Sequence, residues 1–482
     1  MSRRLPRAVA VAALAALALS GCARNPVTGG LELSLISESQ EIRMGREYDP
    51  QVIATMGLYP DSALQRHVQE LGTRLAARSE RPQLPWTFRV VDDPVVNAFA
   101  LPGGFIYVTR GILAHFKSEA ELAAVLGHEI GHVTARHSAR QLSRQQLAQI
   151  GLAVGSIVSP EVERFSGIAG AALGVLFLKH GRDDERQADD LGLRYMRRGG
   201  FDAREMPDVF TMLERVSAAH GGGRTPEWLS THPNPENRRA RIEQQIASLP
   251  PDSLGRVVNR EAYLARLDGM VFGDDPREGF FRGSEFIHPA LRFRLRFPDG
   301  WLTQNQKQAV VAASRAQDAL IQVTLAEQAT ADRAAGAFFG QQGVSGGVAS
   351  RLPVNGLPAV SAPFAARTES GELHGVATFV EHGARVYRLL GYAPEARWRS
   401  YESDARRALG TFQRLTDPAL LDVQPWRVDL VTVDRRATLA DLARQRPSPA
   451  SLETLALINQ RATDATLAAG ERVKWVVGPP LP

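Results

Sequence analysis

The chain has 482 residues, and 44% of them are hydrophobic, which predicts a globular protein of two or three domains. The formal net charge is +5, and it falls to +2 without the N-terminal export-like segment, which has three arginines and no acidic residue. So small a net charge argues against nucleic acid as a partner. The chain has one cysteine, which excludes an intramolecular disulfide.

Residues 1–21 have the pattern of a lipoprotein signal peptide. Three arginines precede an apolar core, Ala8 to Leu19, that is too short to span a bilayer. Small residues then lead to Cys22, which predicts cleavage before this cysteine and lipid attachment to it. Ala23, in place of an aspartate, resembles the outer-membrane sorting class of Gram-negative lipoproteins. We therefore expect a periplasmic protein, lipid-anchored to the outer membrane, with residues 22–36 as a short lipidated tether.

Helical and then extended patterns follow the tether. We expect helices from about Ser39 to Thr55 and from about Asp61 to Ala77, and strands at Trp86 to Val91, Val95 to Leu101 and Phe105 to Thr109. The free backbone groups of an edge strand can pair with an extended peptide whatever its sequence. An edge strand among these could therefore bind an extended substrate, with an ordinary hairpin as the alternative.

The stretch from His128 to His132 has the residue types and spacing of a reaction centre. Residues four apart on a helix lie one above the other, so His128 and His132 can bind one ion, as in half of a zinc site. Glu129 lies beside that face and can act as a general base on water. Ser118 and Glu121 predict a capping box at the start of this helix. The alternative is a chance spacing on a surface helix.

An apolar segment follows, from Ile150 to Leu178. Pro160 and charged residues interrupt it, so its longest apolar run is too short for a membrane span. A buried helical hairpin and a mobile cover over the site are both open, and burial is favoured. His137, five residues after His132, is expected to lie on a different face and not to be a ligand.

A later helix carries Glu185 and Asp189, again four residues apart. It is expected to begin after the candidate caps Asp183 and Asp184 and to end at Gly199. One carboxylate can complete the three protein ligands of a catalytic zinc site, while the other accepts the free N–H of a ligand histidine. The alternative is an acidic helix start that interacts favourably with the helix dipole.

A glycine-rich loop after His220 leads to His232 and Arg238. A histidine brought to the metal could stabilise a developing oxyanion or could occupy the open coordination position. We include His232 in the site with both roles open.

Four ordered motifs in residues 25–245 resemble those of the M48 family of zinc metallopeptidases, in particular its periplasmic lipoprotein branch. These motifs are Asn97 to Gly104, His128 to His132, Glu185 to Asp189 and Thr231 to Pro233. The resemblance implies an α+β fold, with a mainly helical zincin-like domain and a small β-sheet over residues 37–270.

The resemblance also implies roles for individual residues. His128, His132 and Glu185 are the implied ligands of one Zn²⁺, Glu129 is the implied catalytic base, and Asp189 is the implied partner of a ligand histidine. His232 and Arg238 match a histidine and an arginine of the family, and for Arg238 an arginine on a helix surface is the alternative. The implied substrate-binding edge comprises Asn97, Ala98, Phe99 and Ala100.

Two smaller regions follow a boundary near Gly273. Residues 280–415 are expected to form an α+β accessory domain, in which Leu291 to Phe297 alternates as a strand with one arginine face. Residues 420–478 have the order strand, helix, helix, strand and resemble a degenerate LysM module. Its opening, Arg436 to Leu439, departs from the usual Gly-Asp-Thr-Leu. The resemblance in the order of elements makes peptidoglycan a candidate partner, and a structural cap is the alternative.

Two functions from different classes follow from these patterns and from the resemblance. The first is a zinc endopeptidase that cleaves unfolded or misassembled proteins of the cell envelope, with protein substrates and a membrane contact through the lipid on Cys22. The second is an envelope chaperone or peptidoglycan-binding scaffold whose zinc site is held inactive by His232.

Overall fold

The computed structural model describes residues 22–152, 180–219, 228, 232, 235–368 and 371–480. The signal peptide, most of the apolar segment from Ile150 to Leu178 and the loop from His220 to Arg224 lie outside these residues. The chain divides into two compact units, the first combining most residues up to 273 with residues 427–477, and the second containing mainly residues 274–426. Among the described residues, no helix is both long and apolar enough to cross a membrane.

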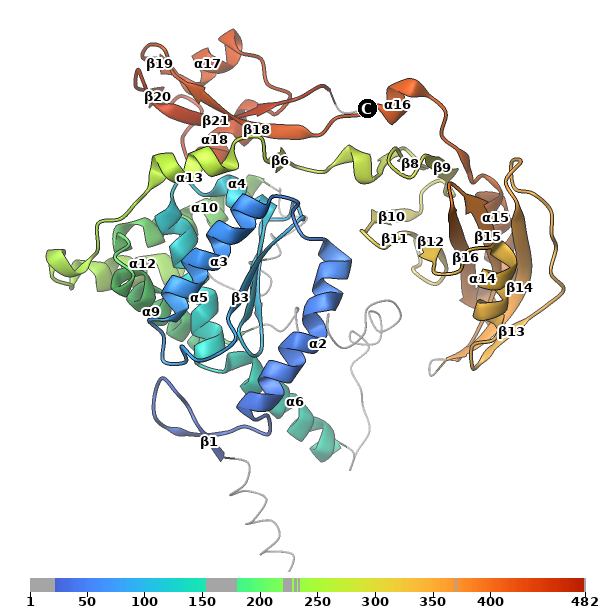
Figure 1. The fold of residues 1–482 in the computed structure, drawn as a ribbon, viewed down its shortest axis with the longest axis horizontal. Coiled ribbons are helices and arrows are strands. Elements are labelled where there is room, and N and C mark those ends of the chain that lie inside the picture. Colours follow the sequence, from blue (N-terminus) through green and yellow to red (C-terminus); the bar gives the residue numbers. More distant parts are fainter. Residues whose placement is uncertain are drawn as a thin grey trace, which may run out of the picture. The chain divides into compact units, whose positions relative to one another are not determined.

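The first unit contains a three-stranded sheet surrounded by helices (Figure 1). The central strand β5 (Phe105–Thr109) pairs in parallel with β3 (Thr87–Val91) and antiparallel with β4 (Ala98–Leu101). The three strands lie within the ranges predicted from alternation and β-branched content. Because β4 is at the edge of the sheet, no other described strand pairs with its outer side.

The helices of the first unit bury apolar stripes on this sheet and on one another. Before the sheet come α2 (Glu38–Met56) and α3 (Ser62–Ala76). After it come α4 (Arg110–His115), α5 (Glu119–Thr134), α6 (His137–Leu152), α9 (Arg182–Arg198), η1 (Ala203–Glu205), α10 (Met206–Ala219), α12 (Pro235–Ala247), η2 (Pro251–Ser253) and α13 (Arg260–Leu267). All residues of α5 are buried, as its run of alanine and aliphatic residues predicts.

The starts of the two motif-bearing helices differ from the prediction in detail. The Ser118 hydroxyl caps α5 by accepting from the Glu121 backbone N–H, but the Glu121 carboxylate accepts from the backbone N–H of Lys117 and not of Ser118. The expected capping box is therefore replaced by two separate caps. Helix α9 begins after Gly181, so Asp183 and Asp184 lie in its first turn, where carboxylates interact favourably with the helix dipole.

The segment after Cys22 is folded. Strand β1 (Cys22–Arg24) pairs antiparallel with β2 (Leu31–Leu33), and the buried Asn25 side chain accepts from the backbone N–H groups of the turn between them. Arg140 of α6 forms an ion pair with Glu32 at 2.9 Å. The expected tether is thus a short hairpin held against α6.

The C-terminal segment shares the core of the first unit. Strand β18 (Trp426–Thr432) pairs with β21 (Arg472–Val477) and with β6 (Val271–Phe272). Between β18 and β21 lie β19 (Ala437–Thr438), α17 (Leu439–Gln445), α18 (Leu452–Ile458) and β20 (Thr466–Leu467). The predicted order of two helices between two strands is present. This segment, which the sequence suggests as a separate module, lies in the same compact unit as the helices before residue 273.

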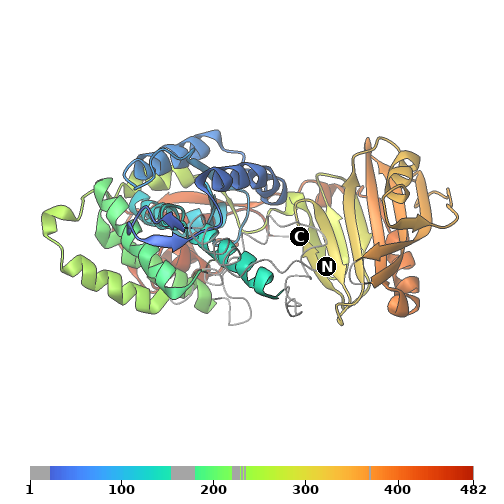
Figure 2. The same cartoon turned by 90° about the horizontal axis from the view of Figure 1, so that it is seen from below.

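The second unit is built of two antiparallel sheets, and Figure 2 shows the strands of the larger one side by side. The larger sheet has the order β10 (Leu302–Asn305), β11 (Ala309–Ala313), β12 (Leu320–Ala326), β16 (Arg385–Pro394), β15 (Gly371–His382), β14 (Ala359–Thr368), β13 (Val344–Gly346). The smaller has the order β17 (Gln413–Arg414), β9 (Phe293–Arg296), β8 (Glu285–His288), β7 (Phe280–Arg282). The helices of the second unit are η3 (Pro276–Glu278), α14 (Ala331–Phe339), α15 (Glu395–Gly410) and α16 (Pro418–Leu421).

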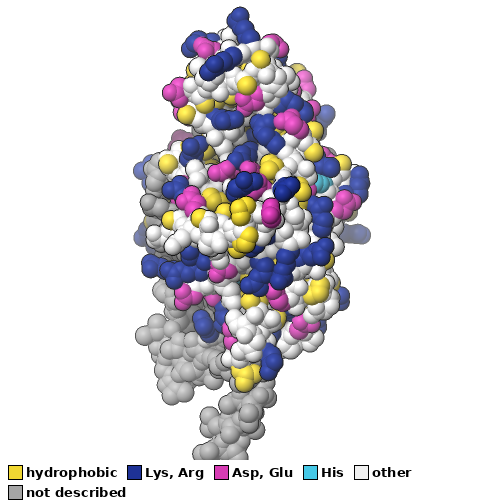
Figure 3. All heavy atoms as spheres, turned by 90° about the vertical axis from the view of Figure 1, so that its left-hand side faces the viewer, with side chains coloured by type: hydrophobic (Ala, Val, Ile, Leu, Met, Phe, Trp, Pro, Cys, Tyr) yellow, Lys and Arg dark blue, Asp and Glu magenta, His cyan; other side chains and the backbone are white. Residues whose placement is uncertain are grey.

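Both units mix helices with small sheets, so the expected mixed class is confirmed. In β9 the alternation predicted from the sequence is present, with Phe293 and Leu295 buried and Arg296 exposed. Lys and Arg side chains are interspersed with Asp and Glu on the face shown in Figure 3, in keeping with the small net charge.

Candidate metal centre and active site

Glycines allow α5 and α9 to pack at backbone contact. A Cβ added at Gly127 or at Gly131 would lie 3.0 Å from a carbonyl oxygen of α9. A Cβ added at Gly192 would lie 3.0 Å from the backbone nitrogen of His128. Because any larger side chain would push the two helices apart, these glycines are what brings the two sequence motifs together.

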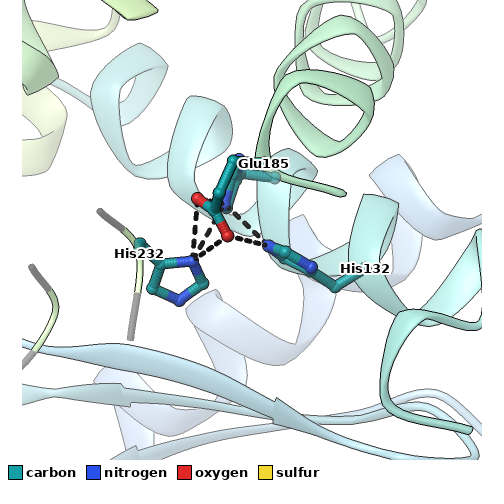
Figure 4. Close-up of side chains that lie close together, drawn as sticks. His132, Glu185 and His232 are labelled. Carbon is teal, nitrogen blue, oxygen red and sulfur yellow. Dashed lines mark hydrogen bonds and ion pairs between the residues drawn. The ribbon is translucent and has the colours of Figure 1, made fainter. Parts of the chain in front are cut away.

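Four side chains converge beside this contact. Figure 4 labels three of them, His132, Glu185 and His232. The Nε2 atoms of His128 and His132 are 2.9 Å apart, and the Glu185 carboxylate lies 3.4 Å from Nε2 of His132 and 3.6 Å from Nε2 of His128. Nδ1 of His232 is 3.0 Å from Oε1 of Glu185. All four residues are buried, and one ligand atom of each lies within 4.8 Å of the others. The structure thus brings the three predicted ligands together and adds His232 to them.

The donor atoms of this cluster fit a zinc ion. Imidazole nitrogens and a carboxylate oxygen are among the ligands that Zn²⁺ prefers. The facing Nε2 atoms of His128 and His132 can share at most one proton between them, whereas a cation can bind the lone pairs of both. The cluster is also closed to solvent, which strengthens its attraction for a cation.

Glu129 lies beside the cluster and does not join it. Its Oε1 is 3.7 Å from Nε2 of His232 and, among the described residues, has no hydrogen-bond partner. Burial raises the pKa of this carboxyl group. A buried carboxylate oxygen that is free to accept a proton is what a general base requires.

Asp189 and Arg238 support the cluster from one side. Oδ1 of Asp189 is 3.0 Å from Nδ1 of His128, the nitrogen that faces away from the cluster. The Arg238 guanidinium donates to both oxygens of Asp189, at 2.9 and 2.6 Å, and its Nη1 is 2.7 Å from Oε2 of Glu185. The position of Arg238 is therefore central, and the helix-surface alternative does not hold, because its side chain is buried.

The charges around the two carboxylates keep them ionised. Burial by itself would raise the pKa of Glu185, but the adjacent His232 and Arg238 outweigh it and lower this pKa to about 2. Burial would likewise raise the pKa of Asp189, but Arg238 and His128 hold it well below its usual range. Burial and the neighbouring histidines lower the pKa of His132, which favours the neutral imidazole that a metal binds.

His137 contacts the site in a way that helical spacing did not predict. Helix α5 ends at Thr134, and Arg136 has a φ of 61°, so the chain turns before α6 begins at His137. Nδ1 of His137 lies 2.9 Å from Nδ1 of His132, and Nε2 of His137 lies 3.0 Å from Oε1 of Gln187 on α9. The expectation that His137 faces away from His132 is wrong, because it assumed one continuous helix.

The predicted substrate edge is at the edge of the sheet. Ala98, Phe99 and Ala100 belong to β4, while Asn97 precedes it and pairs its backbone with Thr109 on the inner side. Phe99 stacks on Tyr107 with ring centroids 4.9 Å apart, which holds the strand on the sheet.

At the predicted lipidation site, the backbone of Cys22 begins β1, but the side chain of Cys22 lies outside the described part of the structure.

Residues 62–246 match the model of peptidase family M48. The chain is 34% identical over 251 residues to a beta-barrel assembly-enhancing protease of Yersinia pestis, covering 50% of this chain and 51% of that protein. It is 33% identical over 229 residues to the protein of that name in Escherichia coli, covering 45% of this chain and 46% of that protein.

A plant protein shows a related similarity. The mitochondrial metalloendopeptidase OMA1 of Arabidopsis thaliana is 37% identical over 172 residues, covering 35% of this chain and 33% of that protein. The chain thus spans about half the length of the bacterial relatives, and less of the plant one.

Proposed function

Because residues 62–246 belong to peptidase family M48, we propose that this chain is a zinc-dependent endopeptidase acting on unfolded or misassembled proteins of the cell envelope. The observation that carries the proposal is the convergence of His128, His132 and Glu185 in one buried cluster. Relatives named as a beta-barrel assembly-enhancing protease and as a metalloendopeptidase support the reaction and, for the bacterial ones, the setting.

His128, His132 and Glu185 would hold the zinc ion, which supplies Lewis-acid chemistry to a peptide carbonyl and to water. Glu129 takes the proton of the attacking water on its free Oε1 and returns it to the leaving nitrogen. Asp189 orients His128 through Nδ1, and Arg238 holds Asp189. The outer side of β4 accepts an extended peptide as a further strand, through backbone contacts that do not depend on sequence.

The test of this proposal is Glu129→Gln, which removes the base but no ligand. We expect the variant to keep the zinc content of the wild type and to lose cleavage of an unfolded protein such as casein by about 10²-fold or more. Glu119→Gln is the matched control, since Glu119 lies on the same helix and contacts Arg74 and Asn259, away from the cluster. Equal cleavage by wild type and Glu129→Gln would overturn the assigned role of Glu129.

His232 supports a second candidate, a chaperone or scaffold with an inactive zinc site. Its Nδ1 lies among the ligand atoms, where it would occupy the coordination position that a peptidase keeps open. We expect His232→Ala to raise cleavage if this ligand inhibits, and to lower it if His232 stabilises the oxyanion. No cleavage by either protein, with zinc bound to both, favours the scaffold.

The remaining proposals concern location. The sequence before Cys22 supports export and a lipid anchor at the outer membrane, with Cys22 at the start of a hairpin that is held close to α6. Peptidoglycan binding by residues 420–478 stays a candidate that the order of two helices between two strands supports.

A further inference from the structure

The two ligand histidines differ in what holds their outer ring nitrogens. Nδ1 of His128 lies 3.0 Å from a carboxylate oxygen of Asp189, which can only accept, and farther, 3.4 Å, from Nη2 of Arg238. The shorter contact places the proton on this nitrogen, and Nε2 keeps its lone pair. Nδ1 of His132 instead faces Nδ1 of a second imidazole, that of His137, at 2.9 Å. An imidazole nitrogen can donate or accept, so this contact alone leaves the tautomer of His132 open.

The contacts of Nε2 of His137 indicate which tautomer His132 has. Its Nε2 lies 3.0 Å from Oε1 of Gln187 and 3.8 Å from Oδ1 of Asp184. The Asp184 carboxylate can only accept, and Oε1 of Gln187 accepts in the amide orientation that the structure has, so Nε2 of His137 carries the proton and its Nδ1 has the lone pair. That lone pair accepts the Nδ1 proton of His132, which leaves Nε2 of His132 unprotonated on the side of Glu185.

We propose that His137 and Gln187 are positioning residues for the zinc site, acting through His132. The chain Gln187 to His137 to His132 holds the ligand ring in its metal-binding tautomer, as Asp189 does for His128. This inference rests on the proposed function, because it assigns the two residues to the same metal centre.

The placement of the chain makes this hydrogen-bonded arrangement rigid. His132 lies in the last turn of α5, His137 begins α6 and Gln187 lies on α9, two residues after Glu185, so three helices meet in it. His132 and His137 are buried, at 1% and 0% exposed, so water does not compete for these nitrogens. The reverse tautomer would place a proton on Nε2 of His132 and prevent metal binding.

The experiment measures zinc affinity of the full chain by competition with a chromophoric chelator. We expect His137→Phe, which keeps a ring but has no acceptor, to raise the dissociation constant by about 10- to 100-fold. His137→Asn places an amide oxygen where Nδ1 was and should restore affinity to within about threefold of the wild type. Gln187→Glu should retain zinc affinity, since a carboxylate can only accept, while Gln187→Met should weaken it.

A spectroscopic readout separates tautomer control from packing. In zinc-free protein, ¹⁵N chemical shifts should show His132 with the proton on Nδ1 in the wild type and in His137→Asn, and a mixture of tautomers in His137→Phe. His180→Phe is the matched control, because His180 stacks on the same ring with centroids 4.1 Å apart, and we expect its zinc affinity to be unchanged.

Three outcomes decide between the possibilities. Equal zinc affinity of wild type and His137→Phe overturns the inference and leaves the proposed function standing. Failure of the wild type to bind zinc overturns the proposed function itself. A second equivalent of zinc, lost in His180→Phe, would show that His132, His137 and His180 bind a metal of their own, and would overturn the positioning role.

Discussion

At the scale of single residues, Arg238 supplies positive charge beside two buried carboxylates of the site. Its guanidinium contacts Asp189 and Glu185, both buried, and lies over the rings of Phe210 and Trp228 at 5.1 Å. A buried carboxylate without a partner is costly, whereas a planar guanidinium can satisfy two carboxylates at once. Arg238 therefore permits two acidic side chains to stand beside the cluster before any metal binds.

Replacing Arg238 by methionine should leave these two carboxylates without their cation. We expect a loss of about 3–5 kcal/mol of stability in the zinc-free protein, and a smaller loss with zinc bound, since the ion restores positive charge. Thermal denaturation with and without zinc measures both. Arg239→Met is the control, because Arg239 is partly exposed and pairs with Glu214, so its cost should be below about 1 kcal/mol. Equal effects of the two variants would contradict this view of Arg238.

At the scale of elements, the pairing of α5 with α9 determines whether the motifs meet. Gly192 faces the backbone of His128, and Gly131 faces Ala188, so the helices approach with no side chain between them. Each motif contributes only part of the donor set. Spacing within one helix places His128 near His132, but the position of Glu185 depends on this helix contact.

A methyl group at Gly192 should separate the two helices by a few tenths of an ångström. We expect Gly192→Ala to weaken zinc binding and to cost about 1–3 kcal/mol of stability, although alanine is the better helix former. Gly336→Ala in α14 is the matched control, because a Cβ there meets nothing within 4 Å, and it should raise stability by up to about 1 kcal/mol. Retention of wild-type zinc affinity by Gly192→Ala would show that the contact has room to adjust.

At the scale of the whole molecule, the C-terminal segment completes the unit that holds the proposed metal site. Gln460 donates to the carbonyl of His115 and to the carboxylate of Glu121, at 2.9 and 2.8 Å. The buried Lys474 amine donates to the carbonyls of Ala114 and Phe116, at 2.7 and 2.6 Å. These contacts lie where α4 ends and α5 begins, so the C-terminal segment supports the start of the helix that carries two of the proposed ligands.

The buried amine gives this contact a dependence on pH. Burial lowers the pKa of Lys474 to about 7, while burial raises that of Glu121 to about 8. Above about pH 8 the folded chain has a neutral Lys474, but the unfolded chain keeps the proton up to its ordinary pKa of about 10.4. The unfolded state therefore binds more protons, and stability from this group rises with pH in that interval.

Lys474→Met removes this dependence. We expect the difference in unfolding free energy between wild type and variant to grow by up to about 1.4 kcal/mol per pH unit between about pH 8 and 9.5. Chemical denaturation at several pH values measures it. A constant difference would mean that the amine stays charged in the folded protein.

Local patterns allowed much of the fold and part of the site to be predicted. The spacing of the histidines and a capping signal at Ser118 located the helix that carries His128 and His132, and strand propensity located β5. These features depend on residues a few positions apart. For the same reason the spacing of the ligand pairs could be interpreted before the fold was known.

The sequence by itself determined the chemistry available to this protein: which side chains can bind a metal, which can act as a base, and which helix bears each. Only the tertiary structure decided that His137 turns back to His132, that Arg238 is buried between two carboxylates, and that Lys474 reaches the start of α5. For Arg238 and Lys474 the physical reason is distance along the chain, and for His137 it is the turn at Arg136. Periodicity describes neighbours within an element, whereas these contacts arise from a turn at positive φ, helix packing and core burial, which involve residues up to hundreds of positions apart.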